Sequence, residues 1–196
     1  MAVERAPILT PEEYLARERE ARTKSEYLAG QVYAMAGASR LHNLVAVNVT
    51  TALALALRGR PCEVYAADMR VRVEATGLYT YPDIAVACDE PTFADASQDT
   101  LTNPVVIVEV LSDSTEGYDR GRKFLHYQML ESLAEYVLVS QAGARVEVFR
   151  RRGTTWLYER ADGRDASVRL EALEVTLRLA DVYERVETEP EDAQAR

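Results

Sequence analysis

The sequence predicts an α+β domain with a mixed central β-sheet flanked by helices. Its 196 residues suit a single well-buried domain, and its 47% apolar and 28% charged residues are ordinary for a globular protein. Runs of β-favouring segments follow one another without a crossover helix between each pair. This order is typical of an α+β fold and argues against a regularly alternating α/β fold.

The domain is expected to span residues 10–185. Thr10-Pro11-Glu12-Glu13 is typical of a helix start, with Thr10 as the N-cap and Glu13 completing a capping box. Residues 1–9 are then an N-terminal extension, and the acidic, proline-bearing residues 186–196 are expected to form a disordered tail.

Two further segments have clear local signals. Glu26–Met35 is expected to form a hairpin that turns near Ala29-Gly30, because β-favouring residues flank a small pair. Arg40–Arg58 carries apolar residues at helical spacing and is followed by Gly59, so it is expected to be the main core helix.

The rest of the chain is read as strands around one more helix. Asp119–Glu131 is expected to be helical, and the polar Asp89–Asn103 connection is expected to be a mobile loop. The expected strands, rich in valine, isoleucine and tyrosine, are Cys62–Ala66, Met69–Glu74, Tyr81–Ala87, Val105–Leu111, Glu135–Ser140, Arg145–Arg151 and Thr155–Glu159.

The charge balance limits the choice of partner. With 23 basic and 32 acidic residues the formal net charge is -9, so the molecule as a whole should repel a polyanion. Contact with phosphates would need several arginines on one face, whereas scattered surface arginines are the ordinary alternative for at least half of them. The candidates are Arg58, Arg60, Arg70, Arg72, Arg120, Arg122 and Arg150-Arg151-Arg152.

Location is inferred from the cysteines and the hydropathy. Cys62 and Cys88 belong to no CxxC or zinc-type cluster, so we expect buried free thiols in a reducing cytoplasm. The sequence has no signal-type apolar core near its start, and no stretch approaches the roughly 20 apolar residues of a membrane span. A cytoplasmic protein without membrane contact is the expectation.

Two acids inside apolar strands give the strongest functional signal. Asp83 follows Tyr81-Pro82, and Glu109 lies within Val106–Leu111. If these strands are neighbours, both carboxylates can converge on a hard cation such as Mg²⁺ or Mn²⁺, which offsets their desolvation. Exposure to solvent or pairing with arginine is an equally weighted alternative for a single strand acid, but two such acids favour the metal.

A third group comes from the expected helix. Asp119, Lys123 and Tyr127 are spaced i, i+4, i+8 and therefore share one face. If this face turns toward the end of the Glu109 strand, the Lys123 ammonium can hold or activate a water beside the metal. A solvated Asp119–Lys123 pair is the simpler alternative.

Together these residues resemble the Uma-type family of restriction-endonuclease-like proteins, a branch of the PD-(D/E)XK nuclease superfamily. The resemblance runs from Thr10 to about Tyr183. The matching pieces, in order, are Pro11-Glu-Glu-Tyr14, Glu26-Tyr27 with Gly30 and Val32-Tyr33, Ser39 with His42-Asn43, Ala67–Val71, Pro82-Asp83, Val108–Ser112 with Ser114-Thr115, Asp119 with Lys123 and Tyr127, and Glu135-Tyr136.

The resemblance implies a restriction-endonuclease-like core and a set of site residues. Asp83, Glu109 and Val110 are the implied metal-binding positions, with Glu26 as a further acid that is equally well read as a surface acid. The strand position two residues after Glu109 is Leu111, so the lysine of the superfamily pattern is expected from the helix, as Lys123. Asp68 and Tyr127 are expected at most to support these groups through hydrogen bonds.

Other chemistries lack their motifs. The chain has two histidines and no Gly-x-Ser-x-Gly, His-Glu-x-x-His or phosphate-binding glycine loop. His42, near the start of the core helix, is expected to cap or pack rather than to catalyse.

The leading hypothesis is a metal-dependent endonuclease that hydrolyses phosphodiester bonds in nucleic acid, most simply DNA, as a homodimer with two sites. Gly77–Tyr81 and Trp156–Tyr158 offer aromatic residues for an interface or, equally, for the core of the sheet. A non-catalytic protein- or nucleic-acid-binding assembly module on the same fold is the alternative.

Overall fold

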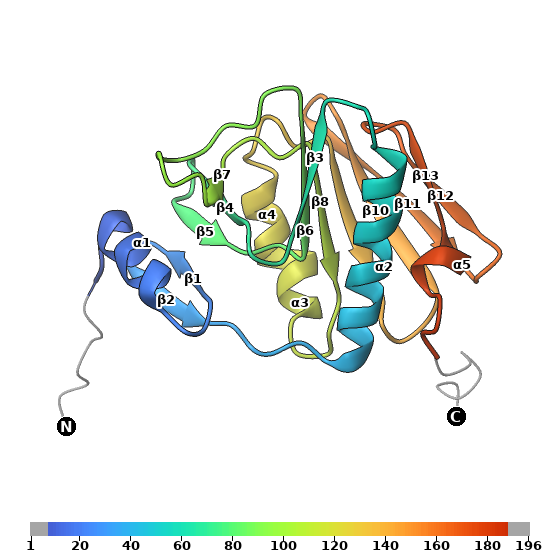
Figure 1. Ribbon diagram of the computed structural model, residues 1–196, viewed down its shortest axis with the longest axis horizontal. Coiled ribbons are helices and arrows are strands. Elements are labelled where there is room, and N and C mark those ends of the chain that lie inside the picture. Colours follow the sequence, from blue (N-terminus) through green and yellow to red (C-terminus); the bar gives the residue numbers. More distant parts are fainter. Residues whose placement is uncertain (1–7, 188–196) are drawn as a thin grey trace.

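The computed structural model describes residues 8–187 and has two main sheets with helices packed against them (Figure 1). The larger sheet has six strands in the order β11-β10-β9-β8-β6-β3. Its strands are β3 (Cys62–Ala66), β6 (Ile84–Cys88), β8 (Val106–Val110), β9 (Glu135–Val139), β10 (Arg145–Arg152) and β11 (Thr155–Asp162). Strands β8 and β9 pair in parallel and the others are antiparallel, so the expected mixed sheet is confirmed.

One face of the large sheet packs against α2 (Arg40–Ala56). The N-cap of this helix is Ser39, whose hydroxyl accepts a hydrogen bond from the His42 backbone N–H. The same apolar cluster includes a C-terminal hairpin of β12 (Ser167–Leu170) and β13 (Val175–Arg178), together with α5 (Leu179–Val182). These three elements follow the last strand that the sequence predicted.

The opposite face packs against the helical segment between β8 and β9 and against the smaller sheet. The helical segment consists of α3 (Glu116–Tyr118), a π-helical turn η1 (Asp119–Lys123) and α4 (Phe124–Tyr127). The smaller sheet has the order β2-β1-β5-β4-β7. Its strands are β1 (Ser25–Leu28), β2 (Gln31–Ala34), β4 (Arg70–Val73), β5 (Leu78–Thr80) and β7 (Thr100–Leu101).

The first helix, α1 (Pro11–Glu20), caps the smaller sheet at the end that carries the β1–β2 hairpin (Figure 1). The expected capping box of Thr10 and Glu13 is present. The hairpin turns at Ala29 and Gly30, which both have positive φ, as expected. Glycine suits this position because its φ is +89°, and a Cβ here would also lie 2.3 Å from Ile8 Cγ2, so that side chain would have to move.

A buried polar network holds α1 to the smaller sheet and to the 89–103 connection. Arg70 donates to the Tyr81 hydroxyl at 2.6 Å, and Tyr81 donates to Glu18 at 3.0 Å. Asp99 forms ion pairs with both Arg70, at 2.7 Å, and Arg19, at 2.8 Å. The 89–103 connection was expected to be a mobile loop. It contains the strand β7 instead, and two arginines bind its Asp99.

Several sequence expectations are corrected. The expected strand at Tyr81–Ala87 begins only at Ile84, as β6, because Tyr81-Pro82-Asp83 form no strand; β5 (Leu78–Thr80), which was not among the expected strands, precedes them. The aromatic residues of Gly77–Tyr81 are buried rather than exposed, because β5 lies inside the smaller sheet. Leu9 and Val186, placed in the extension and the tail, are both buried. The rest of the expected disordered tail, apart from Glu187, lies outside the described residues.

The two cysteines form a disulfide instead of the expected free thiols. Cys62 and Cys88 are direct partners in the antiparallel β3–β6 pair, so the register brings their Cα atoms to 3.9 Å.

Within residues 8–187, no helix combines the length and apolar character needed to span a membrane.

The disulfide predicts a measurable stability difference. It closes a loop with a sequence separation of 26. Replacing Cys62 with Ala should lower the free energy of unfolding by about 3 kcal/mol, because the unfolded chain is no longer constrained. Urea unfolding of the oxidised protein measures this, and a Cys62→Ala/Cys88→Ala double variant should lose no more than the single one. Two free thiols per chain in the denatured, unreduced wild type would contradict the disulfide.

Candidate active site

The candidate site is built around the buried ammonium of Lys123. Its Nζ lies 2.8 Å from Glu109 Oε1 and 3.5 Å from both Glu26 Oε1 and Asp119 Oδ1. All four side chains are buried. The carboxylates come from β8, β1 and the helical segment, so the lysine joins the large sheet, the small sheet and the helix that lies between them.

Glu109 faces this cluster because of strand alternation. Ile107 and Leu111 share its side of β8 and pack in the apolar cluster beneath the helical segment, whereas Val108 and Val110 pack on the α2 side. The Tyr127 hydroxyl donates to Glu109 Oε1 at 2.9 Å. Both polar contacts of Glu109 thus fall on Oε1, and no partner of Oε2 is found among the described residues.

Glu26 is held by two hydroxyl groups as well as by the lysine. Tyr118 donates to Glu26 Oε2 at 2.9 Å, and Thr80 donates to Glu26 Oε1. Glu26 was expected either at a metal or on the surface. It is buried and belongs to the Lys123 cluster, so the surface alternative is wrong.

The helical face predicted for Asp119, Lys123 and Tyr127 is formed, and its solvated alternative is wrong. Asp119–Lys123 form a π-helical turn rather than an α-helical one. A π-turn is rare and often lies at functional sites, because its wider turn changes which side chains share a face. Here Lys123 and Tyr127 both contact Glu109, and Asp119 lies within ion-pair distance of Lys123.

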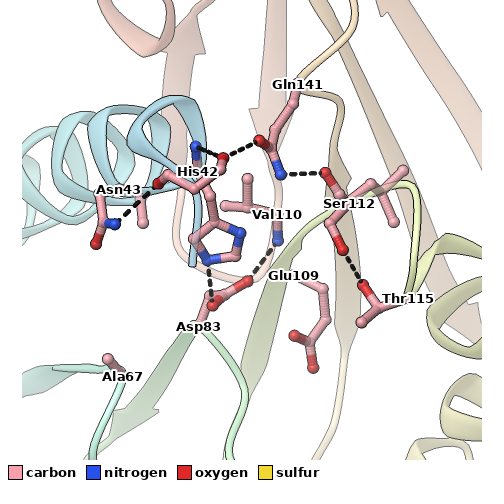
Figure 2. A network of polar contacts seen from close by, with 12 residues as sticks. His42, Asn43, Ala67, Asp83, Glu109, Val110, Ser112, Thr115 and Gln141 are labelled. Carbon is pink, nitrogen blue, oxygen red and sulfur yellow. Dashed lines mark hydrogen bonds and ion pairs between the residues drawn. The ribbon is translucent and has the colours of Figure 1, made fainter. Parts of the chain in front are cut away.

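Asp83 lies next to Glu109 and directly precedes the first residue of β6 (Figure 2). Ile84 pairs with Val108 in the antiparallel β6–β8 ladder, which brings Asp83 to the level of Glu109. The expectation that the two acids lie on neighbouring strands is therefore confirmed. The backbone N–H of Val110 donates to Asp83 Oδ2 at 2.7 Å.

His42 completes the surroundings of Asp83. Its Nε2 lies 2.8 Å from Asp83 Oδ1, and both side chains are partly buried. Sequence reasoning assigned His42 to capping or packing and missed this contact, which joins residues 41 positions apart. The family-type grouping of His42 with Ser39 was the one sequence signal that pointed to it.

The electrostatics of the cluster reflect burial and an excess of acids. Burial, together with the nearby Asp119 and Asp83, raises the pKa of Glu109 to about 8, although Lys123 acts in the opposite direction. Burial also raises the pKa of Asp119. Burial alone would lower the pKa of Lys123, but Glu109, Asp119 and Glu26 raise it well above its ordinary value. Lys123 is therefore held as a cation, and the acids outnumber it.

The residues present suit a hard divalent cation. Within residues 8–187, no ready-formed group of three or more His, Cys, Asp or Glu side chains surrounds one point. Mg²⁺, however, is commonly bound by one or two carboxylates with waters and substrate oxygens as its other ligands. Asp83 and Glu109 Oε2 supply such a pair, and a cation would reduce the excess negative charge there.

Two other sequence expectations have different outcomes. Asp68 does not join the site: its side chain is 90% exposed and pairs with Lys24 at 3.1 Å. Tyr127 does join it, through its hydrogen bond to Glu109. Val110 contributes an N–H to Asp83, and its apolar side chain is buried on the far face.

Most of the arginines proposed for phosphate contact are engaged within the protein. Arg70, Arg120 and Arg150 form ion pairs with buried or partly buried acids. Arg72 and Arg152 pair with Glu74 and Glu171, while Arg60 and Arg151 donate to backbone carbonyl groups. In the described part of the chain only Arg58 and Arg122 of this set have no such partner. The expected alternative was scattered surface arginines; most of the set is indeed engaged away from any phosphate, but Arg70 and Arg150 are buried rather than on the surface.

Comparisons with known proteins show to which family the chain belongs. The Uma2 family model, described as "Putative restriction endonuclease", matches residues 11–181. Two proteins of Synechocystis sp. (strain PCC 6803) are similar in sequence. The protein sll1609 is 38% identical over 176 residues, which cover 89% of this chain and 99% of that protein. The protein slr1290 is 41% identical over 145 residues, which cover 74% of this chain and 75% of that protein.

A solved structure shares the fold. The crystal structure described as "a putative nuclease belonging to DUF820" from Anabaena variabilis ATCC 29413 matches with a TM-score of 0.72. The match covers 91% of this chain and 99% of that one, at 18% identity. The chain thus has the fold of that structure. The chain belongs to the Uma2 family, as the sequence resemblance implied.

The raised pKa of Glu109 predicts how stability depends on pH. The ordinary pKa of 4.5 applies to the unfolded chain and about 8 to the folded one, so the folded protein holds this proton more tightly. The resulting stabilisation is fully present below about pH 4.5 and is lost as the pH rises through about 8. Thermal unfolding in EDTA between pH 5 and 9 should show this decline, and Glu109→Gln should reduce it.

The exposed Glu131 provides the control for this experiment. Glu131→Gln removes a carboxylate outside the cluster and should keep the wild-type slope. A Glu109→Gln curve parallel to that of the wild type would contradict the assignment.

Proposed function

We propose that the protein is a metal-dependent endonuclease that hydrolyses phosphodiester bonds in nucleic acid, most simply DNA. The observation that carries the proposal is the placement of Asp83 and Glu109 on neighbouring strands with a buried Lys123 against Glu109. Mg²⁺ or Mn²⁺ bound by these acids, with Val110 at the same strand end, would polarise the scissile phosphate and lower the pKa of an attacking water.

Lys123 would act as a fixed positive charge in this reaction. Its contact with Glu109 is a short, charge-assisted hydrogen bond at 2.8 Å, whereas its contacts with Glu26 and Asp119 are long, at 3.5 Å. The ammonium has three N–H groups, so it retains the capacity to donate to a phosphate oxygen or to a water. A donor held in place before the reaction stabilises developing negative charge without reorganisation.

Glu26, Tyr118 and Tyr127 would hold this lysine and Glu109 in place. Their hydrogen bonds and ion pairs connect β1, β8 and the helical segment between β8 and β9, and all of these groups are buried or partly buried. The relative position of Lys123 and Glu109 would then depend on these three residues, which do not themselves contact the reacting atoms.

Cleavage assays test the proposal directly. Asp83→Ala, Glu109→Ala and Lys123→Ala should each reduce Mg²⁺- or Mn²⁺-dependent cleavage of DNA by at least about 100-fold, because each removes a ligand or a charge at the reacting centre. Asp68→Ala is the matched control, since this exposed carboxylate pairs only with Lys24, and it should retain activity. Cleavage that survives in all three site variants would rule the proposal out.

A non-catalytic binding or assembly module is the second candidate. Two observations support it: the net charge of -9 opposes the approach of DNA, and most of the candidate arginines are engaged within the protein. Calorimetric titration with Mn²⁺ distinguishes the two. Binding that is lost in Asp83→Ala supports the enzyme, and the absence of binding in the wild type supports the module.

A homodimer is part of the proposal, because cutting both strands of a duplex generally requires two sites. Leu157 and Tyr158 on the edge strand β11 are about half exposed and offer an apolar contact. Light scattering should give twice the chain mass of 21.9 kDa, and Tyr158→Arg should shift the protein toward the monomer. A concentration-independent mass of 21.9 kDa would exclude the dimer and leave nicking of single strands.

A further inference from the structure

His42 is the one imidazole that contacts a candidate metal ligand, and it lies outside the Lys123 cluster. We infer that His42 is a positioning residue that fixes the orientation of the Asp83 carboxylate toward the cation site. This inference rests on the proposed metal-binding role of Asp83, and it adds a function for the N-terminal end of α2.

Both oxygens of Asp83 are held, one by a side chain of α2 and the other by the backbone of β8 (Figure 2). His42 Nε2 lies 2.8 Å from Oδ1, and the Val110 N–H donates to Oδ2 at 2.7 Å. An ionised carboxylate only accepts hydrogen bonds, so Nε2 carries the hydrogen in this contact. Two donors on different oxygens fix the plane of the carboxylate and leave its remaining lone pairs for another partner.

His42 is itself held by the first turn of α2. Ser39 Oγ accepts the His42 backbone N–H at 3.0 Å and donates to Gln141 Oε1 at 2.7 Å. Gln141 Nε2 in turn donates to the Leu111 carbonyl oxygen at 2.6 Å. The helix cap is therefore connected to the end of β8, two residues after Glu109 (Figure 2).

This chain of contacts fixes the position of the Asp83 carboxylate relative to the strand that carries Glu109. One end of the network is the imidazole on Asp83, and the other is the backbone of the strand that carries Glu109. A packing or capping role for His42 would need only its backbone N–H and the bulk of its ring. Neither role requires the directed contact between Nε2 and Asp83, which is made by a side chain that is only 16% exposed.

The first test uses the metal-free protein and does not depend on the proposed function. In His42→Ala, Asp83 should lose its fixed orientation, so the Val110 amide should exchange with solvent about 10-fold faster or more and change its chemical shift. His42→Gln places an amide donor near the position of Nε2 and should restore both. His126→Ala removes the other histidine and is the control. An unchanged Val110 amide in a folded His42→Ala protein would overturn the inference.

The second test measures Mn²⁺ affinity by calorimetry. Losing a group that orients a metal ligand typically weakens binding by about 10- to 100-fold, and His42→Ala should fall in this range with His42→Gln close to wild type. Asp83→Asn should weaken it further. Wild-type affinity in His42→Ala would overturn the inference. If the wild type itself bound no Mn²⁺, the proposed function would fail, while the Val110 amide would still decide whether His42 orients Asp83.

Discussion

Placing one lysine ammonium among acids from three separate elements is the constraint on which the site depends. A buried charge without partners is strongly unfavourable, and so are buried carboxylates next to one another. Lys123 and Glu109 therefore each require the other, and the same ammonium, 3.5 Å from both, helps to stabilise Glu26 and Asp119 inside the protein. The small sheet, the large sheet and the intervening helix are tied together at this point.

The sequence predicted the parts of this site that have a local signature. An acid within an apolar strand stands out, and so do side chains spaced four apart on a helix, which is why Asp83, Glu109 and Lys123 could be named without coordinates. The contact between His42 and Asp83 and the Cys62–Cys88 disulfide depend on which strands are neighbours and in what register. That information is tertiary, and neither residue type nor spacing carries it.

The same distinction explains the fold. Elements with strong periodicity, such as α2 and the apolar strands of the large sheet, were predictable within a few residues. The two-residue strand β7 was not, because Asp89–Asn103 is polar and its order depends on ion pairs of Asp99 with Arg19 and Arg70. Such arginines look like surface cations in a sequence. The ion pairs of Arg19 and Arg70 with Asp99 engage these two cations within the protein, so they are not free to neutralise a polyanion.

The π-helical turn at Asp119–Lys123 has a geometric consequence for the side chains on either side of it. A π-turn contains one residue more than the α-helical turn it replaces, so it corresponds to a single inserted residue within a regular helix. Each residue of an α-helix rotates the chain by about 100°, so the insertion reorients every side chain after it relative to those before. The π-helical turn therefore sets the rotation between Tyr118, which contacts Glu26 before the turn, and Lys123 and Tyr127, which contact Glu109 at its end and after it.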